Sequence, residues 1–180
     1  MVNDQTGEHP PLLVICCGVS GSGKSTVARH LAARFHLHFV EGDDFHPPEN
    51  RARMAAGKPL TDAMREPWIA ALCTHLADQR SLGSSCVMAN SALRRAYRER
   101  YRKLGFRTLF LLLDGPPGVI RERMAARRGH YMPPALLDSQ YAALEPPVGE
   151  EDVVAVDVAG SKSAMCAAAE AAVRERQYRS

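Results

Sequence analysis

Residues 18–25 read Gly-Val-Ser-Gly-Ser-Gly-Lys-Ser and match the pattern G-x-x-x-x-G-K-[ST] at every constrained position. The apolar run at residues 12–17 predicts a buried strand, and residues 26–35 predict a helix. A strand, a glycine-rich turn and a helix in this order form the context that a phosphate-binding loop requires. The alternative is a glycine turn that arose by chance, and the two flanking elements argue against it.

The residue types in this loop suit the phosphates of a nucleotide. Glycine lets the backbone wrap closely around phosphate oxygens, and the following helix presents its positive dipole end to the same anion. Lys24 can reach the β- and γ-phosphates, and the Ser25 hydroxyl can hold Mg²⁺. The predicted nucleotide-binding residues are Gly18, Val19, Ser20, Gly21, Ser22, Gly23, Lys24, Ser25 and Thr26.

The composition is that of one soluble globular domain, with 180 residues, 46% of them hydrophobic and 24% charged. The net charge of +3 is too small to indicate nucleic-acid binding by itself, and it suits an enzyme that handles anions. Five cysteines without a C-x-x-C pair predict reduced thiols, with Cys16 and Cys17 on opposite faces of a buried strand. No apolar run approaches the roughly 20 residues of a membrane span, so we expect a cytoplasmic protein without a membrane partner.

Strands alternate with helices along the chain, which predicts an α/β fold with a five-stranded parallel sheet covered on both faces, a three-layer α/β/α sandwich. We expect residues 1–10 to be a disordered lead-in and residues 11–180 to form a single domain. The predicted strands are 12–17, 38–41, 85–90, 107–113 and 153–157. The predicted helices are 26–35, about 47–57, 67–80, 93–103, 117–128, 134–144 and 161–176.

Carboxylates follow the second predicted strand, where ligands of such sheets bind. Asp43 could accept the proton of an attacking hydroxyl, and Glu41 could help to order the shell of a metal ion. These roles favour phosphoryl transfer to a small molecule. The alternative for the same residues is a simple acidic turn.

Arginines on the helix predicted at 117–128 are a second indication of phosphoryl transfer. Arg123 and Arg127 share one flank of its apolar stripe at 100° per residue, and can close over phosphates. The alternative is a helix with a merely solvated basic face.

Residues 94–107 contain seven basic side chains with two tyrosines between them. Leu93, Tyr97, Tyr101 and Leu104 recur at helical spacing, so we expect the aromatic rings to pack and the arginines to form mostly a solvated face. Nucleic-acid contact is the alternative, and we predict no such partner.

Several further stretches carry a resemblance to a known family. They are Gly42-Asp43-Asp44-Phe45-His46-Pro47 with Asn50, residues 54–62, Arg65-Glu66-Pro67-Trp68-Ile69, Ser91-Ala92-Leu93-Arg94 with Tyr97-Arg98, residues 127–132, residues 136–141 and Leu144-Glu145-Pro146-Pro147. Together with the phosphate loop, and in this order, they resemble the gluconate kinases (gluconokinases), phosphate-loop small-molecule kinases. The likeness runs from about residue 12 to residue 157.

This resemblance implies ATP-dependent phosphorylation of D-gluconate at its 6-hydroxyl, giving 6-phosphogluconate and ADP. It also implies a fold similar to nucleoside monophosphate kinases, a mobile helical lid at about residues 121–145 and a homodimer. A hydroxylated carboxylate needs a cation at one end and hydrogen-bonding groups along the rest. The residues expected to contact it are Asp43, His46, Asn50, Arg53, Arg65, Ser91, Arg94 and His130.

The chain departs from the usual family pattern at four positions, Glu41, Met64, Asn90 and Arg94. Because Arg94 replaces a point charge with a guanidinium fork, a different sugar acid is an alternative substrate. Two further hypotheses stay open: a kinase of a shikimate-like acid or a nucleoside monophosphate, and a nucleotide-dependent switch without transfer activity. The base-reading motif of a guanine switch, Asn/Thr-Lys-x-Asp, does not occur in the sequence.

Overall fold

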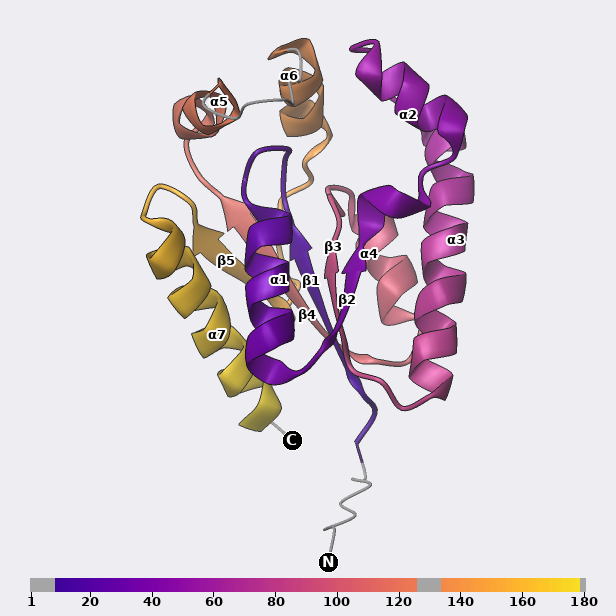
Figure 1. Cartoon of the computed structure of the whole chain (residues 1–180), viewed down its shortest axis with the longest axis vertical. Helices are drawn as coiled ribbons and strands as arrows, with labels where there is room; N and C mark the ends of the chain where they lie inside the picture. Colours follow the sequence, from indigo (N-terminus) through magenta and orange to yellow (C-terminus); the bar gives the residue numbers. More distant parts are fainter. Residues whose placement is uncertain (1–8, 126–133, 179–180) are drawn as a thin grey trace, which may run out of the picture.

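The computed structural model describes residues 9–125 and 134–178, which form one parallel sheet between two layers of helices (Figure 1). The strands are β1 (Leu12–Cys17), β2 (His38–Glu41), β3 (Cys86–Ala89), β4 (Arg107–Asp114) and β5 (Val153–Asp157). The α-helices are α1 (Lys24–Phe35), α2 (Pro48–Ala55), α3 (Asp62–Ser81), α4 (Arg95–Arg102), α5 (Pro117–Ala125), α6 (Pro134–Ala143) and α7 (Lys162–Tyr178), and a 3₁₀ helix, η1, spans Gly42–Phe45. The predicted α/β/α sandwich is confirmed.

The sheet has the order β2-β3-β1-β4-β5, and every strand pair is parallel. All six residues of β1 are buried, because this strand lies in the middle of the sheet and both its faces are covered. Val14 and Cys16 face a core shared with α1 and α7, while Leu13, Ile15 and Cys17 face a core with α3 and α4. The alternation of a strand therefore explains why adjacent thiols lie in different cores.

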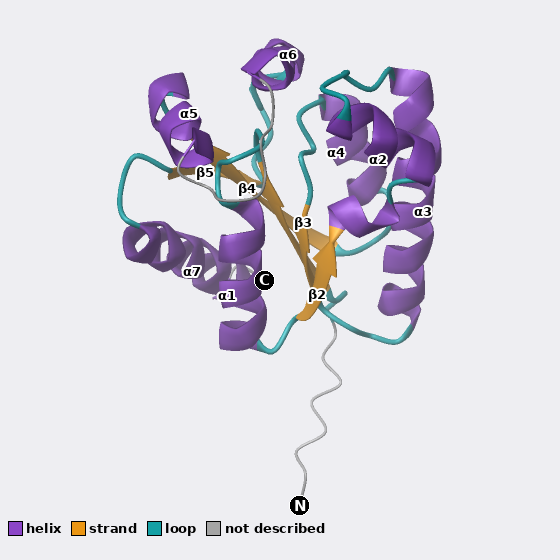
Figure 2. Cartoon of the chain, turned by 45° about the horizontal axis from the view of Figure 1, so that its top comes forward, coloured by secondary structure: helices purple, strands orange, loops and turns teal. Residues whose placement is uncertain are grey.

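All five strands run in the same direction, so the loops that follow them lie together at the carboxyl ends of the strands. The helices α2, α5 and α6 lie at this end of the molecule, beyond the carboxyl ends of the strands (Figures 1 and 2). The phosphate loop follows β1 here, and η1 follows β2. Parallel strands thus bring segments that are far apart in the sequence to one site.

Three predicted helix starts were wrong. The helix expected from residue 26 begins at Lys24. The helix expected from Pro67 begins at Asp62, because the Thr61 side chain caps it by accepting from the Met64 N–H at 3.3 Å. The exposed Pro67 lies in the second turn, where it removes only one helical hydrogen bond.

The helix expected from Leu93 begins at Arg95. The preceding residues stay in a loop because Ala92 has a left-handed backbone (φ 40°) and its N–H donates to Asn90 Oδ1 at 2.9 Å. This loop carries two of the expected substrate residues, so the later helix start matters for the site.

Parts of three predicted segments lie outside the described residues. They are most of the lead-in at 1–10, the end of the helix expected at 117–128, and the middle of the lid expected at 121–145.

Candidate active site

The phosphate loop leaves the central strand through backbone that favours glycine. Gly18 has φ +133°, and a Cβ there would lie 2.6 Å from the Leu113 carbonyl oxygen of β4. Gly21 has φ +82°, and a Cβ there would lie 2.4 Å from Met124 Cγ of α5. The Gly18 N–H donates to the Ser91 carbonyl at 3.1 Å, which ties this loop to the loop after β3. The glycines are therefore required by both conformation and space.

The residues around the loop fit a nucleotide with its metal ion. The Lys24 ammonium donates to the Val19 carbonyl at 2.9 Å and so folds back over the loop. The Ser22 hydroxyl, fully buried within the loop, finds no hydrogen-bond partner in the described chain. Backbone curvature, a cation over the loop and an unpaired hydroxyl all suit a phosphate group.

The Glu41 carboxyl at the end of β2 interacts with the Ser25 hydroxyl. Burial raises the pKa of the Glu41 carboxyl, and the Ser25 hydroxyl and the nearby Arg29 guanidinium oppose that rise. Arg29 Nη2 lies 3.3 Å from Glu41 Oε2. Within residues 9–125 and 134–178, no three His, Cys, Asp or Glu side chains gather as a metal cage. Ser25 and Glu41, the predicted ligands, supply a hydroxyl and a carboxylate side by side, and Mg²⁺ usually takes one or two protein ligands with phosphates and water.

A cavity adjoins the Lys24 side of the loop. Six expected residues line it: Lys24, Asp43, His46, Arg65, Ser91 and Arg94. The remaining lining residues are Met54, Pro59, Leu60, Trp68, Leu93, Tyr97, Leu136, Ser139, Gln140 and Ala143. The cavity therefore combines cations, hydroxyls and apolar walls beside the phosphate loop, as a small polar acceptor requires.

The floor of the cavity is a rigid aromatic pair. The rings of His46 and Trp68 stack at 4.1 Å with an interplanar angle of 18°, and the Trp68 Nε1–H donates to the Gly42 carbonyl at 2.7 Å. Burial lowers the pKa of His46. Asp43 Oδ1 lies 4.0 Å from His46 Nε2, and the Asp43 side chain is 78% exposed, so its carboxylate is accessible to an acceptor in the cavity. Trp68 thus serves both the core and the cavity.

Asp62 organises the cationic side of the cavity. Its carboxylate accepts hydrogen bonds from Arg65 Nη1 at 3.0 Å, Arg94 Nη1 at 2.6 Å and the Tyr97 hydroxyl at 3.2 Å. Partial desolvation opposes ionisation, yet the hydrogen bond from Tyr97 and the two guanidinium charges lower the pKa of Asp62. One carboxylate therefore holds two cations side by side and leaves a net positive charge at this end.

Two expected substrate residues lie beside the cavity, not in its lining. Asn50 is buried and donates to the Met64 carbonyl at 2.8 Å, with its amide 3.5 Å from His46 Nδ1. The Arg53 Nε–H donates to the Pro59 carbonyl at 2.9 Å. Both side chains hold the segment between α2 and α3 in place.

The arginines of α5 point to neighbouring elements. Arg123 donates to the Gly160 carbonyl at 2.7 Å and to Met165 Sδ at 3.2 Å. Arg121 pairs with Asp138 of α6 at 2.6 Å. The expected site residues Arg127 and His130 lie outside the described residues.

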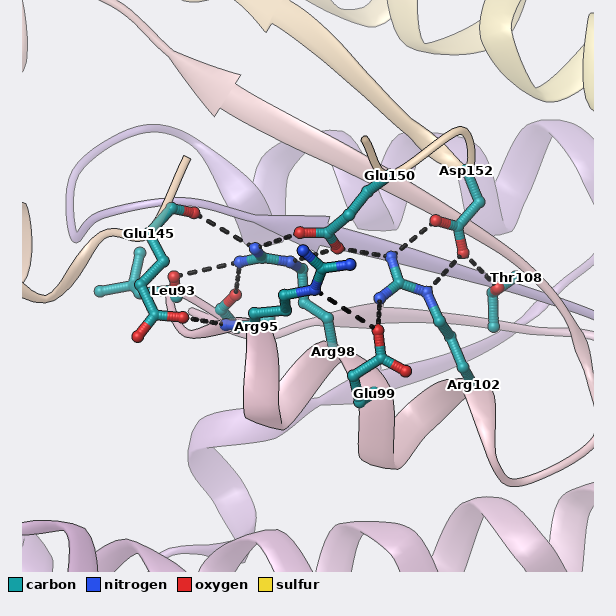
Figure 3. A network of polar contacts seen from close by, with 10 residues as sticks. Leu93, Arg95, Arg98, Glu99, Arg102, Thr108, Glu145, Glu150 and Asp152 are labelled. Carbon is teal, nitrogen blue, oxygen red and sulfur yellow. Dashed lines mark hydrogen bonds and ion pairs between the residues drawn. The ribbon is translucent and has the colours of Figure 1, made fainter. Parts of the chain in front are cut away.

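A buried ion-pair network holds the loop after β3 in place (Figure 3). Arg98 donates to Glu150 through two hydrogen bonds of 2.8 and 2.6 Å, and both side chains are almost fully buried. The same guanidinium donates to the carbonyls of Ala92, Leu93 and Glu145. Arg98 thus fixes the loop that carries Ser91 and Arg94.

The expectation of a mostly solvated arginine face was therefore wrong for Arg98. It was also wrong for Arg102, which donates to both Glu150 and Asp152 at 2.6 Å (Figure 3). The acidic partners lie about 50 residues away along the chain, so helical periodicity could not reveal them. The packing of Tyr101 and Leu93 was predicted correctly, since both are buried.

Comparison with known proteins agrees with this geometry. Residues 13–147 match the family model described as "AAA domain". A gluconokinase of Gluconobacter oxydans (strain 621H) is 45% identical over 152 residues, covering 84% of this chain and 85% of that protein. The chain belongs to the gluconokinase family. The thermoresistant gluconokinase of Escherichia coli (strain K12) is 37% identical, covering 85% of this chain and 88% of that protein.

Solved structures of related kinases have the same fold as this chain. The crystal structure of a gluconokinase from Sinorhizobium meliloti 1021 has a TM-score of 0.83 and 42% identity, covering 92% of this chain and 93% of that one. A sugar kinase from Janibacter sp. HTCC2649 has a TM-score of 0.85 and 40% identity, covering 92% and 95%. The chain is accordingly a phosphate-loop kinase in sequence and in fold. Across the described helices, none has the length and apolar character needed to cross a membrane.

Proposed function

We propose that this gluconokinase-family chain transfers the γ-phosphoryl group of ATP to the 6-hydroxyl of D-gluconate. The observation that carries the proposal is a cavity that joins the phosphate loop to Asp43 at one end and to paired arginines at the other. Relatives named gluconokinase, at 37 to 45% identity over most of the chain, support the choice of acceptor.

The proposed chemistry assigns each end of the acceptor to a different group. Arg65 and Arg94, held by Asp62, would bind the carboxylate, because guanidinium forks match carboxylate geometry. His46 and Ser91 would hydrogen-bond hydroxyls along the chain of the sugar acid. The reactive hydroxyl would then lie beside Asp43.

The proposed transfer of the phosphoryl group takes place in a single displacement at the γ-phosphorus. The 6-oxygen attacks the γ-phosphorus, the bond from that phosphorus to the β–γ bridging oxygen breaks, and Asp43 accepts the hydroxyl proton. Lys24 would offset the charge that develops on the phosphoryl oxygens. Ser25 and Glu41 would hold Mg²⁺, whose role is to neutralise and orient the phosphates.

The lid expected at residues 121–145 is part of the proposal. Arg123 would have to leave the Gly160 carbonyl to reach a phosphate, and Arg127 and His130 would join it there. Protection of the segment around residues 121–132 from protease on addition of ATP would support such closure. We also propose a homodimer, on the strength of the family resemblance, and light scattering of the purified chain tests it. We propose a cytoplasmic location as well, because the sequence has no apolar run as long as a membrane span.

A substrate panel with coupled detection of ADP tests the function. Gluconate should be turned over in preference to related aldonates, shikimate and nucleoside monophosphates. Asp43→Asn should lower kcat by about a hundredfold or more with little change in KM, because the base is lost while the acceptor is still bound. Turnover of another acceptor with none of gluconate would reject the substrate, and an unchanged kcat in Asp43→Asn would reassign the base.

A further inference from the structure

Helix α6 lies beside the phosphate loop and contributes to the lining of the cavity. Leu136 and Leu137 are 5% and 1% exposed and anchor the helix. Beyond its end, the Glu145 N–H donates to the Leu93 carbonyl at 2.9 Å, and the Glu145 carboxylate accepts from the Arg95 N–H at 2.7 Å. Gln140 therefore projects from a helix that is held both by the core and by the loop after β3.

The Gln140 side chain touches the nucleotide site and the cavity at once. Its Oε1 accepts a hydrogen bond from the Ser20 main-chain N–H at 2.6 Å, and the same residue lines the cavity. Ser20 is the third residue of the phosphate loop, whose N–H groups are the donors for phosphate oxygens. A neutral carboxamide oxygen thus satisfies a main-chain donor of the kind that the loop offers to phosphate.

We propose that Gln140 couples the two ligand sites by exchanging partners. Its carboxamide holds the Ser20 N–H while the nucleotide is absent, and pairs with a hydroxyl of the sugar acid once a phosphate oxygen takes that N–H. This inference rests on the proposed function, since it needs a nucleotide phosphate at the loop and a polyol in the cavity.

The exchange of partners by Gln140 follows from the number of hydrogen-bond donors and acceptors that each group has. The Ser20 amide has a single N–H, so Gln140 and a phosphate oxygen compete for it. A released carboxamide offers one acceptor and two donors, and the polyol beside it supplies both kinds of partner. Each ligand therefore makes the binding of the other more favourable, and the coupling is equal in both directions.

The proposal makes substitutions at Gln140 act in opposite directions. Gln140→Ala removes the competitor, so a non-hydrolysable ATP analogue with Mg²⁺ should bind about two- to tenfold more tightly in the absence of sugar acid. Gln140→Glu offers a charged acceptor to the Ser20 N–H and repels phosphate, so the same analogue should bind about tenfold more weakly. A purely structural role would weaken binding in both variants.

Titration calorimetry of the full chain measures these effects. Wild type, Gln140→Ala and Gln140→Glu are titrated with Mg²⁺ and the analogue, with and without gluconate. In wild type, gluconate should tighten binding of the analogue, and in Gln140→Ala this enhancement should fall to about onefold. Asp138→Asn is the matched control, because it breaks the ion pair of α6 with Arg121 and keeps Gln140.

The binding titrations test the role of Gln140, and the ADP assay tests the identity of the acceptor. Tighter binding in Gln140→Ala, weaker binding in Gln140→Glu and a change below about twofold in Asp138→Asn support the exchange. Unchanged or weaker binding in Gln140→Ala, or the same gain in Asp138→Asn, overturns it. Formation of ADP by wild type with gluconate is measured separately, so a wrong acceptor is recognised even when the titrations without sugar succeed.

Discussion

Replacing Glu150 with glutamine tests how strongly the buried network supports the molecule. The two hydrogen bonds from Arg98, helped by Arg102, lower the pKa of Glu150 from 4.5 to about 2 although burial opposes this. At about 1.4 kcal/mol per pH unit, that change corresponds to roughly 3 kcal/mol of preference for the ionised carboxylate in the folded chain. Glutamine keeps the shape of the side chain and removes the charge, so Glu150→Gln should lose about this much.

Thermal and urea unfolding at neutral pH measure the loss. A change of about 1 kcal/mol shifts Tm by roughly 2–4 °C in a chain of this size, so Glu150→Gln should melt about 6–12 °C lower. The exposed neighbour Glu151 gives a matched control, since Glu151→Gln removes the same charge outside the network. A control shift within about 0.5 kcal/mol is expected.

The pH dependence has a definite sign. A carboxyl with a lowered folded-state pKa stabilises the fold fully above its unfolded-state pKa, and this contribution disappears as the pH falls through the folded value. The advantage of wild type over Glu150→Gln should therefore be complete above about pH 4.5 and shrink toward pH 2. An equal loss in Glu150→Gln and Glu151→Gln, or an advantage that does not shrink in acid, would refute the reasoning.

Three further substitutions test the loop and the cavity. Lys24→Met should reduce kcat by at least about a hundredfold, because it removes charge stabilisation at the phosphates; a near-normal rate in the ADP assay would contradict that role. Arg65→Ala should raise KM for gluconate about 10- to 100-fold through loss of a charged hydrogen bond, while the turnover of a neutral sugar alcohol, if measurable, stays unchanged. Gly21→Ala combines a left-handed backbone with displacement of Met124, so unfolding experiments should show a loss of about 1–2 kcal/mol or more, and full stability would argue against the observed packing.

Most of the sheet was predictable because its signals are local. The strands are short apolar runs bounded by glycine or polar residues, and the spacing of the phosphate loop fixes the strand and helix around it. The start of α3 was missed because Pro67 outweighed the capping signal of Thr61. Proline in the second turn of a helix costs one hydrogen bond, and the buried Trp68 and Ile69 hold the helix in place regardless.

The sequence predicted many of the residues of the site, but it predicted less well which of them contact one another. Lys24, Asp43 and Arg65 line one cavity because parallel strands deliver their loops to one edge. Asp62 was missed, since its partners Arg94 and Tyr97 lie 32 and 35 residues away, and no sequence period reports such pairs. Gln140 was missed for the same reason, because its partner in the phosphate loop is 120 residues away.

The stacked ring pair at the floor of the cavity gives the chain an intrinsic optical probe. Trp68 is the only tryptophan in the sequence, and it lies against His46 within the lining. Excitation of the indole therefore produces emission from one place, and a ligand that displaces water there changes the surroundings of that ring. Occupancy of the acceptor site can thus be followed by fluorescence in the unlabelled, unmutated chain.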